Sequence, residues 1–235
     1  MSRPPIRLYA FAFSPYAQKV AALLDFKGIA YEPVFVHPTR KTEIAFSRRK
    51  LVPIIDDAGE FVEASTEIAL YLEASYPDPP TLPDDRAARA EVLRLERWAD
   101  AVFYGRFWVP LFWGVPANRE RAMKSFLDTT AMTPFERFFL PRVGGIIMRD
   151  MIAQAQADLF RLPAALDDLE TRLASGPFLG EQAQASIADL AVFAALSVVT
   201  DMNFEGAERV RERRALLDWM ERVRPLTSSG TRLYG

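Results

Sequence analysis

The side chains best suited to chemistry in this sequence are hydroxyls, because the residues that usually supply nucleophiles and metal ligands are scarce. The chain has no cysteine and a single histidine, His37. Structural disulfides, a cysteine nucleophile and thiolate metal sites are therefore excluded. A zinc site needs several ligands in register, so we expect no metal cofactor. A Ser-His-Asp triad would have to use His37, and its neighbours show no arrangement of that kind.

Ser14 is the hydroxyl whose setting is most informative. The pair Ser14-Pro15 follows the short apolar run Ile6–Phe11, and serine and proline are favoured at the cap and the first position of a helix. The free N–H groups and positive dipole of a helix start stabilise a bound anion. Ser14 therefore either caps the helix alone or also donates its hydroxyl to an anion.

A pattern of strands and helices would position Ser14 within the first third of the chain. The runs Ile6–Phe11 and Tyr31–Val36 predict two strands, and a helix between them makes the pair parallel. Pro33 places the second strand at an edge of the sheet, because proline has no backbone N–H to donate to a neighbouring strand. The remaining predictions are a short helix within Thr42–Arg48, a hairpin of Val52–Asp56 and Glu60–Glu63, and a helix capped by Ser65.

The rest of the chain reads as helical after a proline-rich segment, Tyr76–Asp85, that predicts a linker. Ser186 and Asp189 have the spacing of a capping box and are interpreted as structural. Residues 114–145 show no clear periodicity. We expect an N-terminal domain over residues 1–76, a linker over 77–85 and an all-helical domain over 86–235. Long helices are predicted over Ala87–Trp108, Ile146–Ala174, Ile187–Val199 and Ala207–Val223.

Composition excludes some partners. The net charge of −2 gives no concentrated basic surface, so no nucleic-acid partner is expected. The longest apolar run, near Leu190–Val199, is shorter than the roughly 20 residues of a membrane span. Met1–Ile6 has no long apolar stretch and does not read as a signal peptide. We expect a cytoplasmic protein without membrane association.

Four segments carry a resemblance to a known family. Phe13–Tyr31 contains Ser-Pro-x-x-x-Lys-Val followed by Lys-Gly-Ile and an aromatic residue, and Lys50–Ile55 contains a Val-Pro turn. Ala64–Tyr76 and Phe178–Leu196 complete the set. Together, in this order and spacing, they resemble the serine-type branch of the cytosolic glutathione transferase superfamily. The resemblance implies a thioredoxin-like α/β domain followed by an all-α domain.

The same resemblance implies a reaction in which Ser14 stabilises the thiolate of glutathione. A free thiol has a pKa of about 8.5, and lowering it by two units takes about 2.7 kcal/mol. A hydrogen bond to a charged group supplies about 1.5–3 kcal/mol, so one hydroxyl and a helix dipole suffice. Tyr9 is the main rival for this role and Tyr16 a weaker one.

Glutathione itself would be held by residues around the Val-Pro turn. The resemblance assigns the backbone of Val52 to the cysteinyl part, with a cis bond to Pro53, and assigns Ser65 to the γ-glutamyl carboxylate. Ala64 departs from the family, which usually has Glu or Gln there, so one ligand contact is missing. The glycine carboxylate needs a cation, for which we favour Lys50, then Arg40, from five candidates: Arg40, Lys41, Arg48, Arg49 and Lys50.

A hydrophobic electrophile would lie against aromatic residues that follow the linker. Tyr104 and Trp108 share a helix face, and with Phe11 and Phe13 they form the expected pocket. The resemblance also implies a homodimer. The alternative is a non-catalytic protein of the same fold that binds a ligand or a partner. A disulfide reductase is excluded because Ser14–Ala17 holds no cysteine, whereas peroxidase and isomerase reactions stay open.

Overall fold

The computed structural model describes residues 4–108, 110–147, 149, 159, 161–227 and 233. The first part of the chain alternates between strands and helices in the predicted order. Its elements are β1 (Ile6–Ala10), α1 (Pro15–Phe26), β2 (Tyr31–Phe35), η1 (Thr42–Ile44), β3 (Ile54–Asp57), β4 (Glu60–Glu63) and α2 (Ser65–Ser75).

These strands form one mixed sheet in the order β2-β1-β3-β4. Strands β1 and β2 are parallel, with Leu8 opposite Pro33, while β1, β3 and β4 pair antiparallel. The prediction of a parallel pair with Pro33 on an edge strand is therefore confirmed. The β3–β4 turn is closed by Gly59, which has a φ of 97° and donates its N–H to Asp56 Oδ1 at 2.8 Å.

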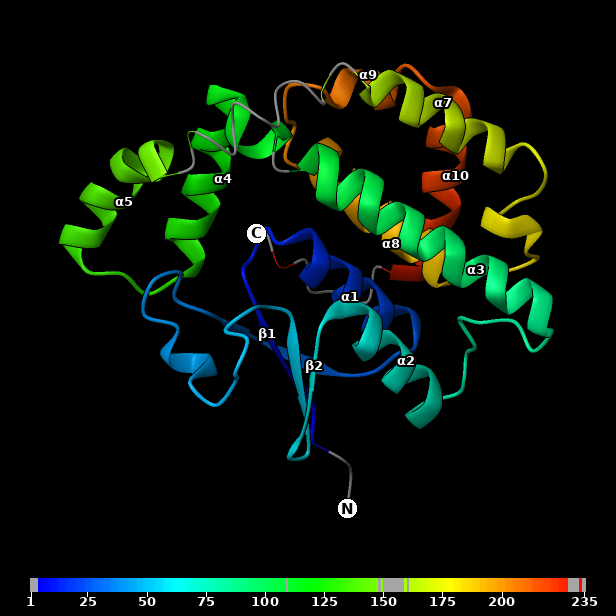
Figure 1. Ribbon diagram of the computed structural model, residues 1–235, viewed down its shortest axis with the longest axis horizontal. Helices are drawn as coiled ribbons and strands as arrows, with labels where there is room; N and C mark the ends of the chain where they lie inside the picture. The colour runs from blue at the N-terminus through cyan, green and yellow to red at the C-terminus, as the bar shows by residue number, and fades with distance from the viewer. Residues whose placement is uncertain are drawn as a thin grey trace.

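The rest of the chain is helical, and Figure 1 shows it lying over the sheet and its helices α1 and α2. Its elements are α3 (Arg86–Ala99), η2 (Asp100–Trp108), η3 (Pro110–Gly114), α4 (Pro116–Thr129), α5 (Pro134–Ile147), α7 (Leu162–Leu173), η4 (Leu179–Glu181), α8 (Ile187–Asp201), α9 (Ala207–Arg211), α10 (Arg214–Val223) and η5 (Arg224–Thr227).

Helix α8 forms the centre of the helical part. Every residue from Ile187 to Val199 is buried, and the helix packs against α1 on one side and α3 on another. Its start is the predicted capping box, in which Asp189 accepts hydrogen bonds from the backbone N–H and the hydroxyl of Ser186, at 2.9 and 2.8 Å. Asp189 also accepts from Trp219 Nε1 at 3.0 Å, so it joins α8 to α10.

Three helical predictions differ from the structure. Residues 114–145 show no clear periodicity in the sequence, but most of them form α4 and α5, which stand apart from the other helices in Figure 1. The predicted helix Ala87–Trp108 is α-helical only to Ala99 and then widens into the π-helical η2. The predicted helix Ala207–Val223 is two helices, broken where Arg213 adopts an extended backbone and pairs with Asp167 of α7 at 2.7 Å.

The predicted helix Ile146–Ala174 is covered only in part. Its final turns are observed as α7, from Leu162 to Leu173, and its first residues end α5. Residues 148, 150–158 and 160 lie outside the described residues. In the part of the chain that the structure describes, no helix is both long and apolar enough to cross a bilayer.

Candidate functional site

Ser14 occupies the N-cap of α1, as predicted. Its Oγ accepts a hydrogen bond from the N–H of Ala17 at 3.4 Å, and its own N–H donates to the carbonyl of Phe11 at 3.0 Å. A hydroxyl that accepts one bond still has its hydrogen to donate. Capping the helix and donating to a bound anion are therefore compatible roles for Ser14.

A cavity of about 370 Å³ lies between the first turn of α1, the turn before β3 and the start of α2. Its walls combine three of the favoured site residues, Val52, Pro53 and Ser65, with the weaker candidates Tyr16 and Arg49. The full lining is Tyr16, Arg49, Leu51, Val52, Pro53, Glu63, Ala64, Ser65, Thr66 and Asp100. Ser14 is two residues from Tyr16 in the chain but is itself almost buried, with 9% of its surface exposed.

Val52 offers the cavity an unpaired stretch of backbone. The Val52–Pro53 bond is cis, as the resemblance implied. Strand β3 begins only at Ile54, and neither the N–H nor the carbonyl of Val52 has a hydrogen-bond partner among the described residues. Free donors and acceptors of this kind can pair with an extended peptide as an added strand does.

Ser65 does not cap α2, which corrects the prediction. The cap position belongs to Ala64, with a φ of 73°, and Ser65 is the first helical residue. The N–H groups at a helix start have no partners within the helix, and the residues at this start, Ala64, Ser65 and Thr66, line the cavity. The start of α2 is therefore a suitable contact for a carboxylate.

The two favoured cations are engaged elsewhere. Lys50 Nζ donates to the carbonyls of Ile44 and Ala45. Arg40 lies 3.6 Å from Glu136 and donates to the carbonyl of Ala131 at 3.3 Å. Neither residue lines the cavity.

Arg49 is the cation that does line the cavity. Its side chain is exposed and has no partner among the described residues. It was among the five sequence candidates, but nothing in the sequence distinguished it from Arg48.

The sequence did not predict the acidic side chains at the wall of the cavity formed by α3 and η2. Asp100, at the junction of α3 and η2, lines the cavity and lies 3.1 Å from the ammonium of the buried Lys19. Lys19 also pairs with Glu96, whose Oε1 accepts the hydroxyl of Thr66 at 2.6 Å. A signal was available, since Lys19 interrupts the buried side of α1 and Glu96 and Asp100 are four residues apart.

Burial raises the pKa values of two side chains at this wall of the cavity. It raises the pKa of the Asp100 carboxyl, although the Lys19 ammonium opposes the shift. Burial, assisted by the charge of Asp100, raises the pKa of the Tyr16 hydroxyl. Tyr16 is therefore a neutral hydrogen-bond donor at pH 7. The cavity thus has a positive group, Arg49, as well as carboxylates, and suits a ligand that carries both charges.

Tyr9, the rival to Ser14, belongs to a separate small cluster. It is 3% exposed and packs with Val36, Ile44 and Ile54, and its ring meets Phe46 edge-on at 5.4 Å. Tyr9 does not line the cavity, whereas Tyr16 does.

The four residues expected to form a hydrophobic pocket are mostly packed against one another or their neighbours. Phe13 stacks on Trp108, with ring centroids 6.1 Å apart, and Phe11 meets Phe126 of α4 at 5.9 Å. Tyr104 is buried and its hydroxyl donates to the carbonyl of Ala191. Trp108 Nε1 is buried and has no hydrogen-bond partner among the described residues.

His37, the single histidine, is buried and connects two parts of the molecule. Its Nδ1 accepts from the N–H of Arg40 at 3.2 Å, and its Nε2 faces Glu136 Oε1 of α5 at 3.3 Å. In the described residues no group of three His, Asp or Glu side chains is placed to hold a metal ion.

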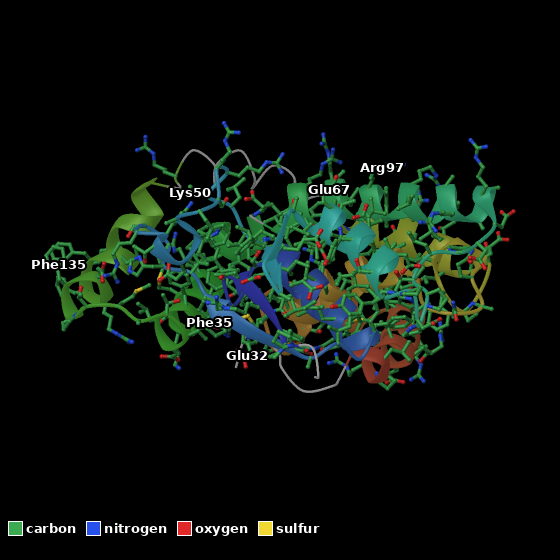
Figure 2. The ribbon with its side chains drawn as sticks, turned by 90° about the horizontal axis from the view of Figure 1, so that it is seen from below. Glu32, Phe35, Lys50, Glu67, Arg97 and Phe135 are labelled. Atoms are coloured by element: carbon green, nitrogen blue, oxygen red, sulfur yellow. The ribbon has the colours of Figure 1, made fainter. Side chains whose placement is uncertain are left out.

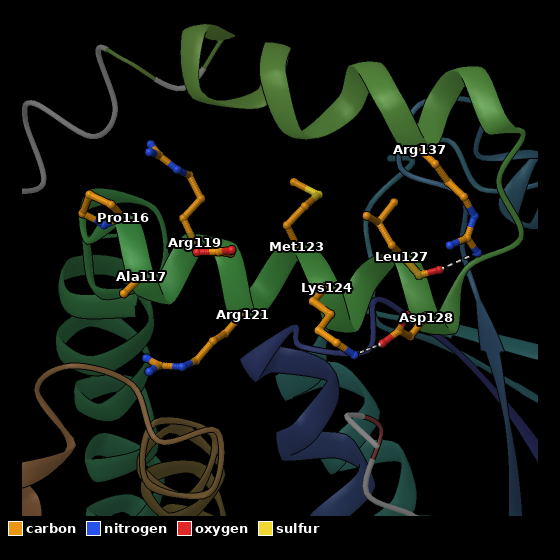
Figure 3. Close-up of a pocket in the computed structure, with 10 residues that line it drawn as sticks. Pro116, Ala117, Arg119, Arg121, Met123, Lys124, Leu127, Asp128 and Arg137 are labelled. Carbon is orange, nitrogen blue, oxygen red and sulfur yellow. Dashed lines mark hydrogen bonds and ion pairs between the residues drawn. The ribbon is translucent and has the colours of Figure 1, made fainter.

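A second, larger cleft of about 850 Å³ runs along α4, facing α5, and contains none of the predicted site residues. Figure 3 shows Arg119, Met123 and Leu127 of α4 pointing toward α5, and Arg137 of α5 donating to the carbonyl of Leu127 at 2.8 Å. This cleft is distinct from the cavity at Val52 and Ser65.

Comparison with known proteins relates the chain to a family. The profile described as "Glutathione S-transferase, N-terminal domain" matches residues 8–80, and the one described as "Glutathione S-transferase, C-terminal domain" matches residues 153–222. Together they span more than half of the chain.

Curated relatives match over little more than a third of the chain. Glutathione S-transferase omega-1 of Mus musculus is 33% identical over 88 residues, which are 36% of this chain and 37% of that protein. Maleylpyruvate isomerase of Ralstonia sp is 30% identical over 95 residues, 38% of this chain and 45% of that protein. The chain therefore aligns with less than half the length of these relatives.

Solved structures match over nearly the whole chain. A glutathione S-transferase from Rhodospirillum rubrum F11 superposes with a TM-score of 0.68 at 23% identity, covering 97% of this chain and 90% of that one. Glutathione transferase GSTFuA3 from Phanerochaete chrysosporium has a TM-score of 0.71 at 18% identity, covering 96% and 98%. At these identities the likeness concerns the fold.

Proposed function

We propose, from the premise that this chain belongs to the glutathione S-transferase superfamily, that it binds glutathione in the 370 Å³ cavity and activates its thiol beside Ser14. The observation that carries the proposal is the meeting of Val52, Pro53 and Ser65 in one cavity with Tyr16 of the first turn of α1. The N-terminal domain over residues 1–76 would then supply the thiol site, and the helical domain over 86–235, joined by the linker 77–85, would complete it.

Each part of the tripeptide has a matching group. The cysteinyl unit pairs with the unpartnered backbone of Val52, in the manner of an added strand. The γ-glutamyl carboxylate binds the start of α2 at Ser65, and its ammonium faces Asp100. Arg49 takes the glycine carboxylate in place of Lys50 and Arg40, whose side chains are bound to Ile44 and Glu136.

The thiol is activated by electrostatics. Ser14 donates its hydroxyl hydrogen to the sulfur while its oxygen keeps the bond from Ala17. The hydrogen bond contributes about 1.5–3 kcal/mol and the helix dipole about 0.3–1 kcal/mol. These contributions are enough to lower the pKa of a thiol by about two units. The thiolate then attacks an electrophile that lies against Phe11, Phe13 and Trp108, with Tyr104 supporting them.

A homodimer would cover an apolar surface beside the cavity. Phe46, Leu51 and Phe61 are 47%, 64% and 48% exposed, and the rings of Phe46 and Phe61 are 4.5 Å apart. Leu51 also lines the cavity. We expect wild-type protein to sediment as a dimer and Phe61→Ser to sediment as a monomer at the same concentration.

The second candidate function is that of a non-catalytic protein of the same fold that binds another ligand or a partner. Ala64 favours it, because the family usually has Glu or Gln at this position and the contact is absent here. The close packing of Phe13 on Trp108 and on Phe112, with ring centroids 6.1 and 5.0 Å apart, also favours it, because these aromatic side chains contact one another.

Calorimetric titration with glutathione at pH 7 separates the two candidates. We expect saturable binding of one tripeptide per chain, weakened in Ser65→Ala. Absence of binding would overturn the enzyme and support the non-catalytic protein. The ultraviolet absorption of the bound thiolate, followed against pH, then tests activation of the thiol. A thiol midpoint well below about 8.5 supports the enzyme, and an unshifted midpoint supports a non-catalytic protein.

A further inference from the structure

The outer face of α5 is an exposed aromatic surface. Phe135, Phe138 and Phe139 are 67%, 54% and 42% exposed. Their rings contact one another, with centroids 4.3 Å apart for Phe135 and Phe139 and 5.1 Å for Phe138 and Phe139. Large apolar patches of this kind on a protein surface mark contacts with a partner or a membrane.

The position of this face suits contact with a broad surface. Figure 1 shows α4 and α5 projecting from the side of the molecule, and Figure 2 shows Phe135 at its outer end. The three rings stand on one side of a single convex helix, with spacings of three and four residues. A projecting convex face can enter a soft, flat surface without a matching groove.

Charge on this part of the chain is positive although the whole chain is negative. The segment 116–147 holds five cationic residues, Arg119, Arg121, Lys124, Arg137 and Arg142, and three acidic ones, Glu120, Asp128 and Glu136, a net charge of +2. The chain as a whole has a net charge of −2, so the remainder carries −4. Such a separation orients the molecule in the field of an anionic surface, with α4 and α5 leading.

The aromatic face itself carries a cation. The guanidinium carbon of Arg142 lies 3.8 Å from the centre of the Phe138 ring. The nearby acid Glu136 is directed away, toward His37 and Arg40. Arginine beside exposed phenylalanine is typical of helices that lie in the interface of a bilayer, where the rings reach the acyl boundary and the cation meets phosphate.

We propose that the outer face of α5 docks on an anionic lipid bilayer, with Phe135, Phe138 and Phe139 inserted among the headgroups and Arg142 against lipid phosphates. The helix lies on the surface and does not span it. The sequence alone indicated no membrane association, because the aromatic residues of 114–145 were not recognised as one helix face. This inference is independent of the glutathione site, so Ser14→Ala should bind vesicles as the wild type does.

Sedimentation with phospholipid vesicles tests the proposal on the full-length chain. We expect binding to vesicles of phosphatidylcholine mixed with phosphatidylglycerol, and at least about tenfold weaker binding to phosphatidylcholine alone. The variant Phe135→Ser/Phe138→Ser should lower the partition coefficient by more than about tenfold. Leu226→Ser, which replaces an exposed apolar residue outside this segment, is the matched control and should have no effect.

Charge is tested separately. Arg142→Glu leaves all three rings in place and should weaken binding to the anionic vesicles by about tenfold. Equal binding to neutral and anionic vesicles, an effect of Leu226→Ser as large as that of the phenylalanine variant, or no binding would overturn the proposal. Self-association of the wild type that is lost in Phe135→Ser/Phe138→Ser, without vesicle binding, would assign the face to a second copy instead.

Discussion

The ammonium of Lys19 lies 3.1 Å from Asp100 Oδ1 and also pairs with Glu96, although Lys19 is 1% exposed. Lys19 belongs to α1 and the two acids to the junction of α3 and η2, so a buried ionic cluster joins the sheet-bearing part of the chain to the helical part. Asp100 and Thr66, which share this cluster, also line the cavity. One wall of the proposed glutathione site is therefore built on the contact between the two parts.

Removing the charge of Lys19 should destabilise the protein strongly. Lys19→Met leaves the fully buried Glu96 without a counter-ion, and breaking a buried pair in this way costs about 3–5 kcal/mol. Urea unfolding measures the change in the free energy of unfolding. The double variant Lys19→Met/Glu96→Gln should recover much of the loss. If the double variant were as unstable as the single one, the cluster would not act as an ion pair.

Ser14 should control the ionisation of bound glutathione with a small effect on folding. Ser14→Ala removes the donor and should raise the pKa of the bound thiol by about one to two units, because a hydrogen bond to an anion is worth about 1.5–3 kcal/mol. The lost helix cap should cost about 1 kcal/mol of stability. Thiolate absorption against pH measures the first effect. Ser14→Thr retains a hydroxyl and should behave as the wild type, and a larger shift in Tyr9→Phe or Tyr16→Phe would transfer the role to that tyrosine.

Arg49 and Arg48 provide a matched pair for the carboxylate contact. Both are exposed arginines, but only Arg49 lines the cavity. Arg49→Gln should weaken glutathione binding about tenfold, as expected for one charge-assisted hydrogen bond. Arg48→Gln should change the affinity by no more than about twofold. Calorimetric titration compares them, and equal losses would mean that only the net charge of the region matters.

Glu73 should make the stability of the fold depend on pH. Its carboxylate accepts from the N–H and hydroxyl of Thr81, and it pairs with Lys27 at 2.9 Å. Burial alone would raise the pKa of Glu73, but the bonds from Thr81 and Lys27 outweigh burial and lower it. A depressed pKa gives stability that is present above about pH 4.3 and lost as the pH falls through the folded value.

The variant Glu73→Gln should therefore lose about 2 kcal/mol at pH 7 and depend less on pH below about pH 4. Urea unfolding at a series of pH values measures both. Glu221→Gln, at an exposed position of α10, is the control and should follow the wild type. An identical acid response in the wild type and Glu73→Gln would contradict the assignment.

Asp189 should be essential for stability and not for chemistry. Its carboxylate accepts four bonds, from the N–H groups of Leu179 and Ser186, the hydroxyl of Ser186 and Trp219 Nε1. Asp189→Ala leaves several buried donors without partners, each costing about 1–3 kcal/mol, so the loss should exceed about 3 kcal/mol. Asp189→Asn should be intermediate, because its amide oxygen can still accept. Full stability with lost turnover would make Asp189 part of the site.

The sequence predicted the parts of the fold that local signals specify. Ser14-Pro15 begins α1, Pro33 lies on an edge strand, and Ser186 and Asp189 form their capping box. Each depends on backbone geometry within a few residues. Helix α5 was missed for the opposite reason. Its phenylalanines face outward, so over residues 134–140 the usual stripe of buried apolar residues is absent.

The predicted site was partly assembled by the fold and partly rearranged by long-range contacts. Val52 and Pro53 directly precede β3, and Ser65 begins α2. The starts of these two elements line one cavity. Lys50 contacts the carbonyl of Ile44 and Arg40 contacts Glu136, so neither side chain reaches the cavity. No local sequence pattern reveals these contacts. Asp100 enters from a helix 35 residues after Ser65, and only the packing of α3 beside α2 and Lys19 brings it there.

Glu136 makes two separate sets of contacts at the beginning of α5. Its Oε2 accepts the N–H and hydroxyl of Thr133, at 2.8 and 2.9 Å, while its Oε1 faces His37 from the other half of the molecule. The same carboxyl group therefore caps the start of α5 and attaches this helix to His37. An isotope label on that carboxyl would report the attachment of α5 directly. A fluctuation that broke the contact with His37 would also loosen the first turn of the helix.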